Sequence, residues 1–159
     1  VLGKLTVDFA LLVFPTFPPQ LVYILESTTG CPSWTAGLPA TKRDFEVCEE
    51  RLGFCLPSSY KLFTQVHNGF HLESWDTIGP RALHDLYTIS ELLGNTKHSK
   101  NLLAFSGDGA GNEQCFNMDM PVKDRNYTTI DWDHETREIS HSQFFWDYIR
   151  DLISEKICL

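Results

Sequence analysis

The chain has 159 residues, enough for one domain with its own core and too few for a second domain of ordinary size. Its 13 Lys and Arg stand against 21 Asp and Glu, so the net charge is −8, which argues against binding of nucleic acid through the phosphate backbone. Hydrophobic residues make up 42% of the chain and aromatic residues 13%, and this composition excludes a wholly disordered protein.

Cysteine usage and the apolar segments predict a cytoplasmic protein. The cysteines are Cys31, Cys48, Cys55, Cys115 and Cys158; their number is odd and no two form a C-x-x-C pair, so we expect buried, reduced thiols and no zinc site. The apolar run at 9–14 is shorter than the roughly 20 residues that span a membrane. It also lacks the basic start of a signal peptide.

Residues 1–40 are apolar and interrupted by prolines, and we predict an N-terminal arm that packs on a domain spanning 41–159. Residues 21–26 fit either a strand or the start of a helix. Residues 28–33 predict a loop, because Gly and Pro interrupt regular structure there.

A helix is predicted to begin after Thr41. Thr41 is a good N-cap residue and Asp44 follows at the position of the capping-box acid. Gly53 is placed to end this helix. The apolar positions Phe45, Cys48 and Leu52 share one face, and the other side carries Glu46, Glu49, Glu50 and Arg51.

A second helix is predicted to begin at Leu56, Pro57 and Ser58 and to stop at Asn68-Gly69, two residues that tolerate left-handed backbone. Its apolar stripe contains Tyr60, Leu62, Phe63 and Val66. A short strand over 70–75 follows. Thr88 and Glu91 form a T-x-x-E capping box for a short helix over 89–93, which Gly94 ends.

The C-terminal half predicts strands and one last helix. Strands are expected at 102–105, 114–118 and 128–132, with turns at 106–112 and 133–138. Ser142 is expected to cap the final helix, whose apolar face would comprise Phe144, Phe145, Tyr148, Ile149, Leu152 and Ile153. The element order predicts an α+β protein with helices packed on a mainly antiparallel central sheet.

No motif in the chain predicts catalysis or a cofactor. The glycine-rich turn at 107–111 lacks the Gly-Lys pair of a phosphate loop, and counting from Asp108 the calcium-loop pattern fails at Ala110 and Glu113. His134 lies in no H-E-x-x-H sequence, and no G-x-S-x-G is present. We therefore predict no catalytic residue, metal or cofactor; an enzyme using the turn at 108–112 and His134 is the remaining alternative from that class.

Acidic residues gather at Asp44, Glu46, Glu49 and Glu50, and again at Asp131, Asp133, Glu135 and Glu138. Such clusters serve solubility, or they steer a basic partner toward the surface. On the second interpretation the predicted partner-binding residues are Asp108, Asn112, Asp131, Asp133 and Glu135.

Two blocks of sequence resemble one known superfamily. In the first, an acidic helix ends in Leu-Gly, followed by Leu-Pro, a Tyr, an apolar helix and Asn-Gly; the matching residues are Leu52, Gly53, Leu56, Pro57, Tyr60, Asn68 and Gly69. The second block contains residues 108–112, Trp132 with the Asp-His-Glu that follows, and 142–144. Together, in this order over about residues 41–155, they resemble the SUKH superfamily, which includes fungal cell-wall-assembly regulators, bacterial toxin-immunity proteins and a domain of some F-box proteins.

The resemblance implies a scaffold and a binding function. The matched residues, with Trp132, would hold the fold and would carry no reaction. We predict a non-enzymatic domain that binds another protein, foremost an immunity protein that neutralises a toxin such as a basic nuclease. The alternative is a regulatory or adaptor domain of a eukaryotic or viral protein on the same scaffold. Neither interpretation involves direct nucleic-acid binding or a membrane span.

Overall fold

The computed structural model of the chain describes residues 34–72, 79–94, 101–122 and 126–156. Residues 34–145 form one compact unit, and a second groups residues 1–33 with 146–159. The predictions for 21–26 and 28–33, and for Cys31 and Cys158, fall outside the described residues. The predicted arm over 1–40 stays a prediction. Within the described ranges, every helix is too short or too polar to traverse a bilayer.

Helix α3 (Lys42–Leu52) begins and ends where its sequence predicts. The Thr41 side chain accepts a hydrogen bond from the Asp44 amide, and the Asp44 carboxylate accepts one from the Thr41 amide at 2.7 Å, which completes the capping box. Gly53 closes the helix in the left-handed conformation, with φ of 77°. The predicted inner face is confirmed by the burial of Phe45 and Cys48.

Helix α4 (Ser58–Thr64) is shorter than predicted, and Gln65 is its C-cap. The prediction that Asn68-Gly69 ends this helix is wrong. The chain leaves the helix after Thr64, and the amides of Val66 and His67 both donate to the Phe63 carbonyl in the turn that follows. Gly69 has a different task. Its φ is 93°, and a Cβ at this position would lie 2.9 Å from the Ala82 amide nitrogen.

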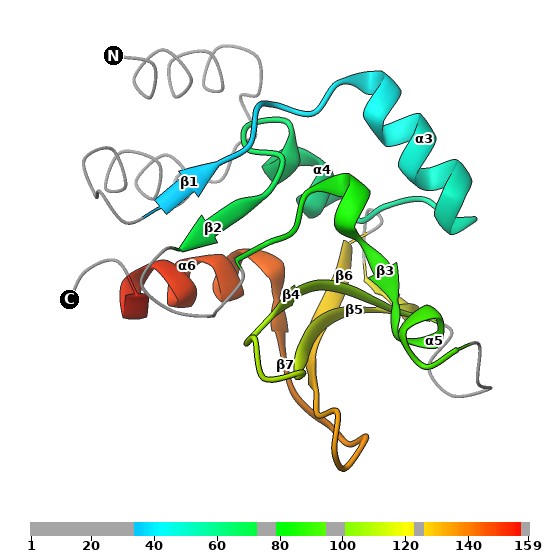
Figure 1. The fold of residues 1–159 in the computed structure, drawn as a ribbon, viewed down its shortest axis with the longest axis vertical. Coiled ribbons are helices and arrows are strands. Elements are labelled where there is room, and N and C mark those ends of the chain that lie inside the picture. Colours follow the sequence, from blue (N-terminus) through cyan, green and yellow to red (C-terminus); the bar gives the residue numbers. More distant parts are fainter. Residues whose placement is uncertain (1–33, 73–78, 95–100, 123–125, 157–159) are drawn as a thin grey trace. The chain divides into compact units, whose positions relative to one another are not determined.

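The main sheet has five antiparallel strands in the order β3-β4-β5-β6-β7 (Figure 1). Their bounds are β3 Tyr87–Thr88, β4 Leu102–Gly107, β5 Glu113–Val122, β6 Asn126–Trp132 and β7 Ile139–Phe144. A separate antiparallel pair joins β1 (Trp34–Ala36) and β2 (Phe70–Leu72). The predicted α+β class with an antiparallel central sheet is confirmed.

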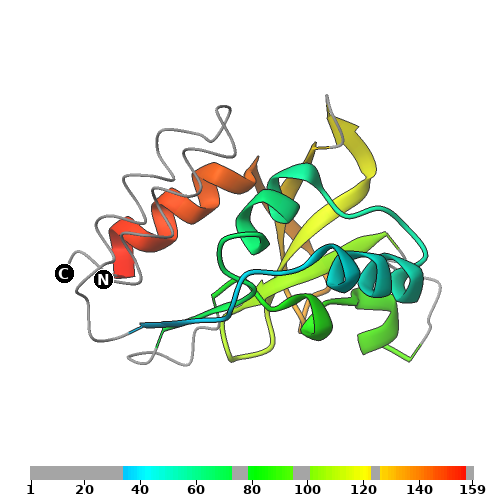
Figure 2. The same ribbon diagram turned by 90° about the horizontal axis from the view of Figure 1, so that it is seen from above.

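Two short helical elements complete the unit over 34–145. Helix α5 (Ile89–Leu92) has the predicted capping box between Thr88 and Glu91. The 3-10 helix η1 (Leu83–Asp85), which the sequence did not reveal, lies beside α3, as both ribbon views show (Figure 2). Here the Cys48 thiol and the Arg51 guanidinium both bond to the Leu83 carbonyl.

The two faces of the sheet are packed differently. On one face lies an aromatic cluster, in which the ring centroids of neighbouring members are 4.4–6.4 Å apart. Its members are Tyr60, Phe63, Phe105, Phe116 and Phe145. The opposite face carries a mainly aliphatic cluster formed by Ile89, Leu102, Ala104, Cys115, Ile130 and Trp132. Aromatic pairs in these geometries stabilise a core beyond simple burial.

The last strand corrects a prediction. Ser142 does not cap a helix, because it lies inside β7 and pairs with Ile130 on β6. The register shifts here, so that His141 is an extra residue in β7, as in a β-bulge. Helix α6 (Phe145–Lys156) therefore begins two residues later than a cap at Ser142 predicts. Phe144 is 51% exposed in the strand, while Phe145, Ile149 and Leu152 are buried.

The cysteines agree with prediction at two of three described positions. Cys48 and Cys115 are free and buried, and burial raises the pKa of both thiols. Cys55 is free but exposed, contrary to prediction, because it lies in the short corner between α3 and α4. The two buried thiols act as small hydrophobic side chains.

Candidate protein-interaction surface

The turns after β4 and β6 lie at the same end of the sheet. Gly107 pairs with Glu113, Glu113 with Trp132, and Trp132 with Ile139, so the four strands begin or end on one row. Residues 108–112 and 133–138 extend beyond this row. We call residues 108–112 and 131–138 the acidic turn end; it contains all five predicted partner-binding residues.

Asp108 shapes the first turn. One carboxylate oxygen accepts hydrogen bonds from the amides of Ala110 at 2.8 Å and Asn112 at 3.1 Å, and the other accepts one from the Asn112 side chain at 2.7 Å. Gly109 and Gly111 have positive φ, as the sequence predicted for a tight hairpin. Both oxygens of the Asp108 carboxylate are therefore used in hydrogen bonds that hold the turn.

Asn112 and His134 connect the two turns. The Asn112 side-chain oxygen accepts a hydrogen bond from the His134 amide at 3.2 Å and lies 3.1 Å from the ring Nδ1 of His134. The backbone of Gly111 lies under the same ring, and a Cβ there would be 3.0 Å from Cγ of His134. These contacts hold the two turns side by side. Asn112 and His134 are 22 residues apart in the sequence, so no local sequence pattern predicts this pairing.

Asp133 builds the second turn. Its carboxylate accepts hydrogen bonds from the amides of Glu135 at 2.9 Å and Thr136 at 2.8 Å. The backbone hydrogen bond from Thr136 holds the pKa of Asp133 below its usual value. Arg137 takes left-handed backbone with φ of 60°, and its amide bonds to the Asp133 carbonyl. This carboxylate is therefore ionised and committed to the turn.

Acids at the acidic turn end that project outward are better suited to contact a partner. Glu135 and Glu138 are exposed, and Asp131 is half-buried on β6 between Gln114 and Ser140. Of the five predicted residues, Asp108, Asn112 and Asp133 hold the turns together. Asp131 and Glu135 are left for contacts, and Glu138 joins them by position. Their role in binding stays a prediction.

The signature residues at the helix corner have structural roles. The Leu56 amide donates to the Glu49 carboxylate at 2.7 Å, and Lys61 pairs with the same carboxylate at 2.5 Å. Glu49 was predicted on the side of α3 opposite its apolar face. In the structure its carboxylate connects α3 to the Leu56 backbone and to Lys61 of α4. Pro57 is the N-cap residue of α4, and Leu52, the last residue of α3, is half-buried.

Tyr60 lies at the centre of the aromatic cluster. Its side chain is fully buried against the rings of Phe63, Phe105 and Phe116, and its hydroxyl donates to the Arg81 carbonyl. Trp132, another signature residue, is 1% exposed in the aliphatic cluster. Both are core residues of the scaffold.

Asn68 and Gly69 fix the segment before β3. The Asn68 side-chain oxygen accepts a hydrogen bond from the Leu83 amide at 2.8 Å and so anchors η1. Gly69 allows the close approach of Ala82 described above. This pair therefore joins α4 to η1 instead of ending the helix.

A buried ion pair lies beside the acidic turn end, and the sequence did not reveal it. Arg81 and Glu113 are 2.8 Å apart with side chains only 9% and 7% exposed. Tyr87 donates to the Glu113 carboxylate at 2.6 Å, and the Arg81 guanidinium lies 4.8 Å from the centroid of the Tyr87 ring. Burial and the bond to Glu113 raise the pKa of Tyr87. The pair is 32 residues apart in the chain, so no local pattern marks it.

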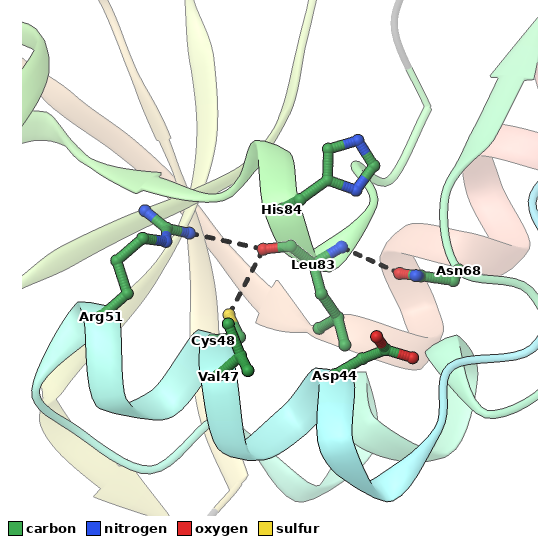
Figure 3. A pocket seen from close by; sticks show the side chains of 7 residues that line it. All are labelled: Asp44, Val47, Cys48, Arg51, Asn68, Leu83 and His84. Carbon is green, nitrogen blue, oxygen red and sulfur yellow. Dashed lines mark hydrogen bonds between the residues drawn. The ribbon is translucent and has the colours of Figure 1, made fainter.

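An open cleft of about 310 Å³ lies between α3 and η1 (Figure 3). Its lining consists of Asp44, Val47, Cys48, Arg51, Asn68, Leu83 and His84. Arg51, Cys48 and Asn68 are bonded to the backbone of Leu83, as the dashed lines in Figure 3 show. These polar side chains hold η1 in place, so the cleft offers few of the convergent polar groups of a small-molecule site.

Within the described ranges, no group of three or more His, Cys, Asp or Glu side chains is arranged to hold a metal ion. His134 and Asp108, the residues of the alternative enzyme interpretation, belong to the hydrogen bonds of the turns. These hydrogen bonds commit both side chains to the shape of the turns.

Comparison with protein families gives one match. The model of the SMI1/KNR4 family (SUKH-1) matches residues 39–155. This range contains both signature blocks and all of the described strands of the five-stranded sheet. Comparison with curated proteins gives no significant match.

Proposed function

Because the chain belongs to the SMI1/KNR4 family (SUKH-1), we propose that it is a non-enzymatic domain that binds a basic protein through its acidic turn end. Domains of this family are in general non-catalytic immunity or regulatory domains, and this supports protein–protein interaction as the activity of the chain. The observation that carries the proposal is the contact of Asn112 with His134, which joins the glycine-rich turn at 108–112 to the acidic turn at 133–138.

Charge supports this surface as the point of encounter. Asp131, Glu135 and Glu138 lie within a few residues of one another, against Arg137 as the basic residue of the same segment. The whole chain adds a net charge of −8. A concentrated negative field raises the rate at which a basic partner associates and disfavours acidic partners.

Toxin neutralisation is the specific form of binding that we propose. A nuclease needs a cationic active site, because its substrate is a polyanion. An acidic protein surface matches the same cations and blocks substrate access while bound. The acidic turn end provides exposed carboxylates on a scaffold of hydrogen-bonded turns, which keeps their geometry fixed before binding.

An affinity pulldown with the full chain as bait, eluted over a salt series, tests the proposal. We expect one basic protein in near-stoichiometric amount that is released as salt increases, since salt screens exposed charges. A toxin as that protein supports neutralisation, and a component of a larger eukaryotic or viral assembly supports the adaptor function instead. Recovery of only acidic or neutral proteins contradicts the charge-based proposal.

Charge reversal locates the surface. The variant Glu135→Lys with Glu138→Lys removes exposed acids that the turn hydrogen bonds do not use, and we expect at least tenfold weaker capture. The matched control is Glu46→Lys with Glu50→Lys on α3, which makes the same change in net charge. Equal loss in both variants contradicts the assignment to the acidic turn end.

A further inference from the structure

Strand β7 forms one edge of the five-stranded sheet. It is the last strand of the five-stranded sheet and pairs with β6 on one side; within 34–72, 79–94, 101–122 and 126–156, no strand pairs with its other side. The opposite edge is β3, which has only two residues, whereas β7 has six. An edge of this length exposes backbone donors and acceptors that can pair with another chain.

The first and last residues of this edge strand are apolar and exposed. Ile139 is 56% exposed and Phe144 is 51% exposed. They lie opposite Trp132 and Thr128 on β6, and the extra residue at His141 brings both to the same face of the sheet. Trp132 belongs to the aliphatic cluster, so this face of the sheet extends outward from the cluster to Ile139, Ser142 and Phe144 at the edge.

Edge protection is limited on β7. Native sheets protect their edges with Lys, Pro or bulges. The strand sequence is Ile-Ser-His-Ser-Gln-Phe, with no Lys and no Pro, so the bulge at His141 is its protective feature. The segment from Ser142 to Phe144 keeps a regular register with β6 beyond the bulge. An added strand therefore has a continuous stretch against which to pair.

The charge next to the edge selects the occupant. β7 begins directly after the acidic turn end, where Glu135 and Glu138 are exposed. The strand itself has no Asp, Glu, Lys or Arg. A segment that lies along β7 would thus meet uncharged side chains along the strand, with Ile139 and Phe144 as its apolar contacts, and carboxylates at the Ile139 end.

We propose that an extended segment of a basic partner pairs with β7 as a sixth strand. Its apolar side chains pack on Ile139 and Phe144, and its Lys or Arg residues meet Glu135 and Glu138. This is recognition by β-strand addition, in which backbone hydrogen bonds supply affinity and alternate side chains supply specificity. It rests on the proposed function and adds the conformation and the chemistry of the partner segment.

Two synthetic probes test this pairing on the isotope-labelled full chain by NMR titration. The first is a nine-residue capped peptide of alternating Lys and Val, which can form a strand. The second has the same charge but Pro in place of each Val, so four of its nine residues lack an N–H and its backbone favours polyproline II over a strand. We expect the first to bind at least tenfold more tightly, with the largest amide shifts in β7 and cross-strand contacts to Ser142–Phe144.

Side-chain variants separate the edge from other exposed apolar residues. Ile139→Thr with Phe144→Thr keeps β propensity and changes only exposed positions, so the fold is retained. We expect this double variant to bind the Lys–Val peptide at least fivefold more weakly than the wild type does. Met120→Thr, at a 63% exposed position on β5, is the matched control and leaves binding unchanged.

Three other outcomes would contradict strand addition to β7, and each has its own consequence for the proposed function. Equal binding of both peptides, with shifts confined to residues 131–138, rejects strand addition but keeps the acidic surface. Shifts centred on the cleft between α3 and η1 also reject it. If neither peptide binds, the β7 inference fails, while the pulldown with its charge-reversal variants still decides the proposed function.

Discussion

The aromatic cluster and the acidic turn end lie on one sheet and use their polar atoms differently. In the aromatic cluster, Tyr60 is fully buried and its hydroxyl is bonded to the Arg81 carbonyl. At the acidic turn end, Asp108 and Asp133 bond to nearby amides, while Glu135 beside them remains exposed. In the aromatic cluster the side chains serve the packing of the core. At the acidic turn end some side chains fix the backbone and others remain exposed for recognition.

The residues that define the family and the residues proposed to determine binding specificity therefore lie in different parts of the molecule. Signature residues such as Tyr60, Gly69 and Trp132 are in the scaffold, so the match to the family describes how the chain folds. The exposed acids Glu135 and Glu138 lie in a turn that Asp133 holds together. We therefore expect core substitutions to change stability with little effect on binding, and substitutions of exposed acids to do the reverse.

The largest expected effect is in the aromatic cluster. Phe116→Ala removes a fully buried ring that contacts Tyr60, Phe105 and Phe145, and we expect a loss of about 3–5 kcal/mol in the free energy of unfolding. Urea denaturation measures it. Phe144→Ala, at a half-exposed position, is the control and should lose about 1 kcal/mol or less. Similar losses in the two variants would mean that the cluster does not carry the stability of the fold.

The buried ion pair gives the next effect. Glu113→Gln leaves the Arg81 charge buried without its counter-charge, and we expect about 3 kcal/mol of destabilisation. Replacing both residues, as Arg81→Met with Glu113→Leu, should recover much of that loss, since no charge is then buried unpaired. A double-mutant cycle measured by chemical denaturation provides the coupling energy. Additive single losses would show that the two groups do not interact.

His67 predicts a pH dependence of stability. Burial lowers its pKa from 6.5 to about 4, so the unfolded chain binds a proton between these values that the folded chain does not. Stability contributed by the neutral imidazole is therefore present above pH 6.5 and is lost as the pH falls toward 4, by about 2 kcal/mol at pH 4.5. Thermal melts of the wild type and His67→Gln measure it, and the variant should show a smaller decline over this range. Parallel declines would place the titration elsewhere.

Gly111 connects stability and recognition. Gly111→Ala would strain a residue with φ of 107° and push a Cβ to 3.0 Å from the His134 ring, so we expect about 1–2 kcal/mol of destabilisation. Because the two turns would separate, binding of the partner should weaken as well. Gly94→Ala, where φ is also positive and no atom lies within 4 Å of the added Cβ, is the control for backbone strain alone. Equal binding by the two variants would contradict a role for the joined turns.

The smallest effect on stability is expected at the exposed acids. Glu135→Lys with Glu138→Lys changes no hydrogen bond of the acidic carboxylates that build the turns, and we expect a change within about 0.5 kcal/mol. Thermal unfolding at fixed pH and salt tests this. A loss above about 2 kcal/mol would show that these carboxylates support the fold.

Sequence alone predicts the elements that local chemistry defines. Thr41 with Asp44 and Thr88 with Glu91 mark two helix starts correctly, because capping boxes act within four residues. The glycine-rich turn after β4 was likewise predictable from the positive φ that Gly109 and Gly111 adopt.

The features that sequence missed depend on distant partners. Ser142 has the chemistry of a helix cap, but pairing with Ile130 holds it in β7. Strand β3 has two residues and exists through its pairing with β4. The Arg81–Glu113 pair and the contact of Asn112 with His134 also join segments that only the fold brings together. The acids were found by composition, and their division into turn-building and exposed groups required the hydrogen bonds.

The most direct test of the account is the association rate of the captured partner with three chains: wild type, Glu135→Lys with Glu138→Lys, and Glu46→Lys with Glu50→Lys. At low salt we expect about a tenfold slower rate for the variant of the acidic turn end and little change for the α3 variant, with the difference vanishing near 1 M salt. Equal rates for the two variants, or a difference that survives high salt, would contradict recognition through the acidic turn end.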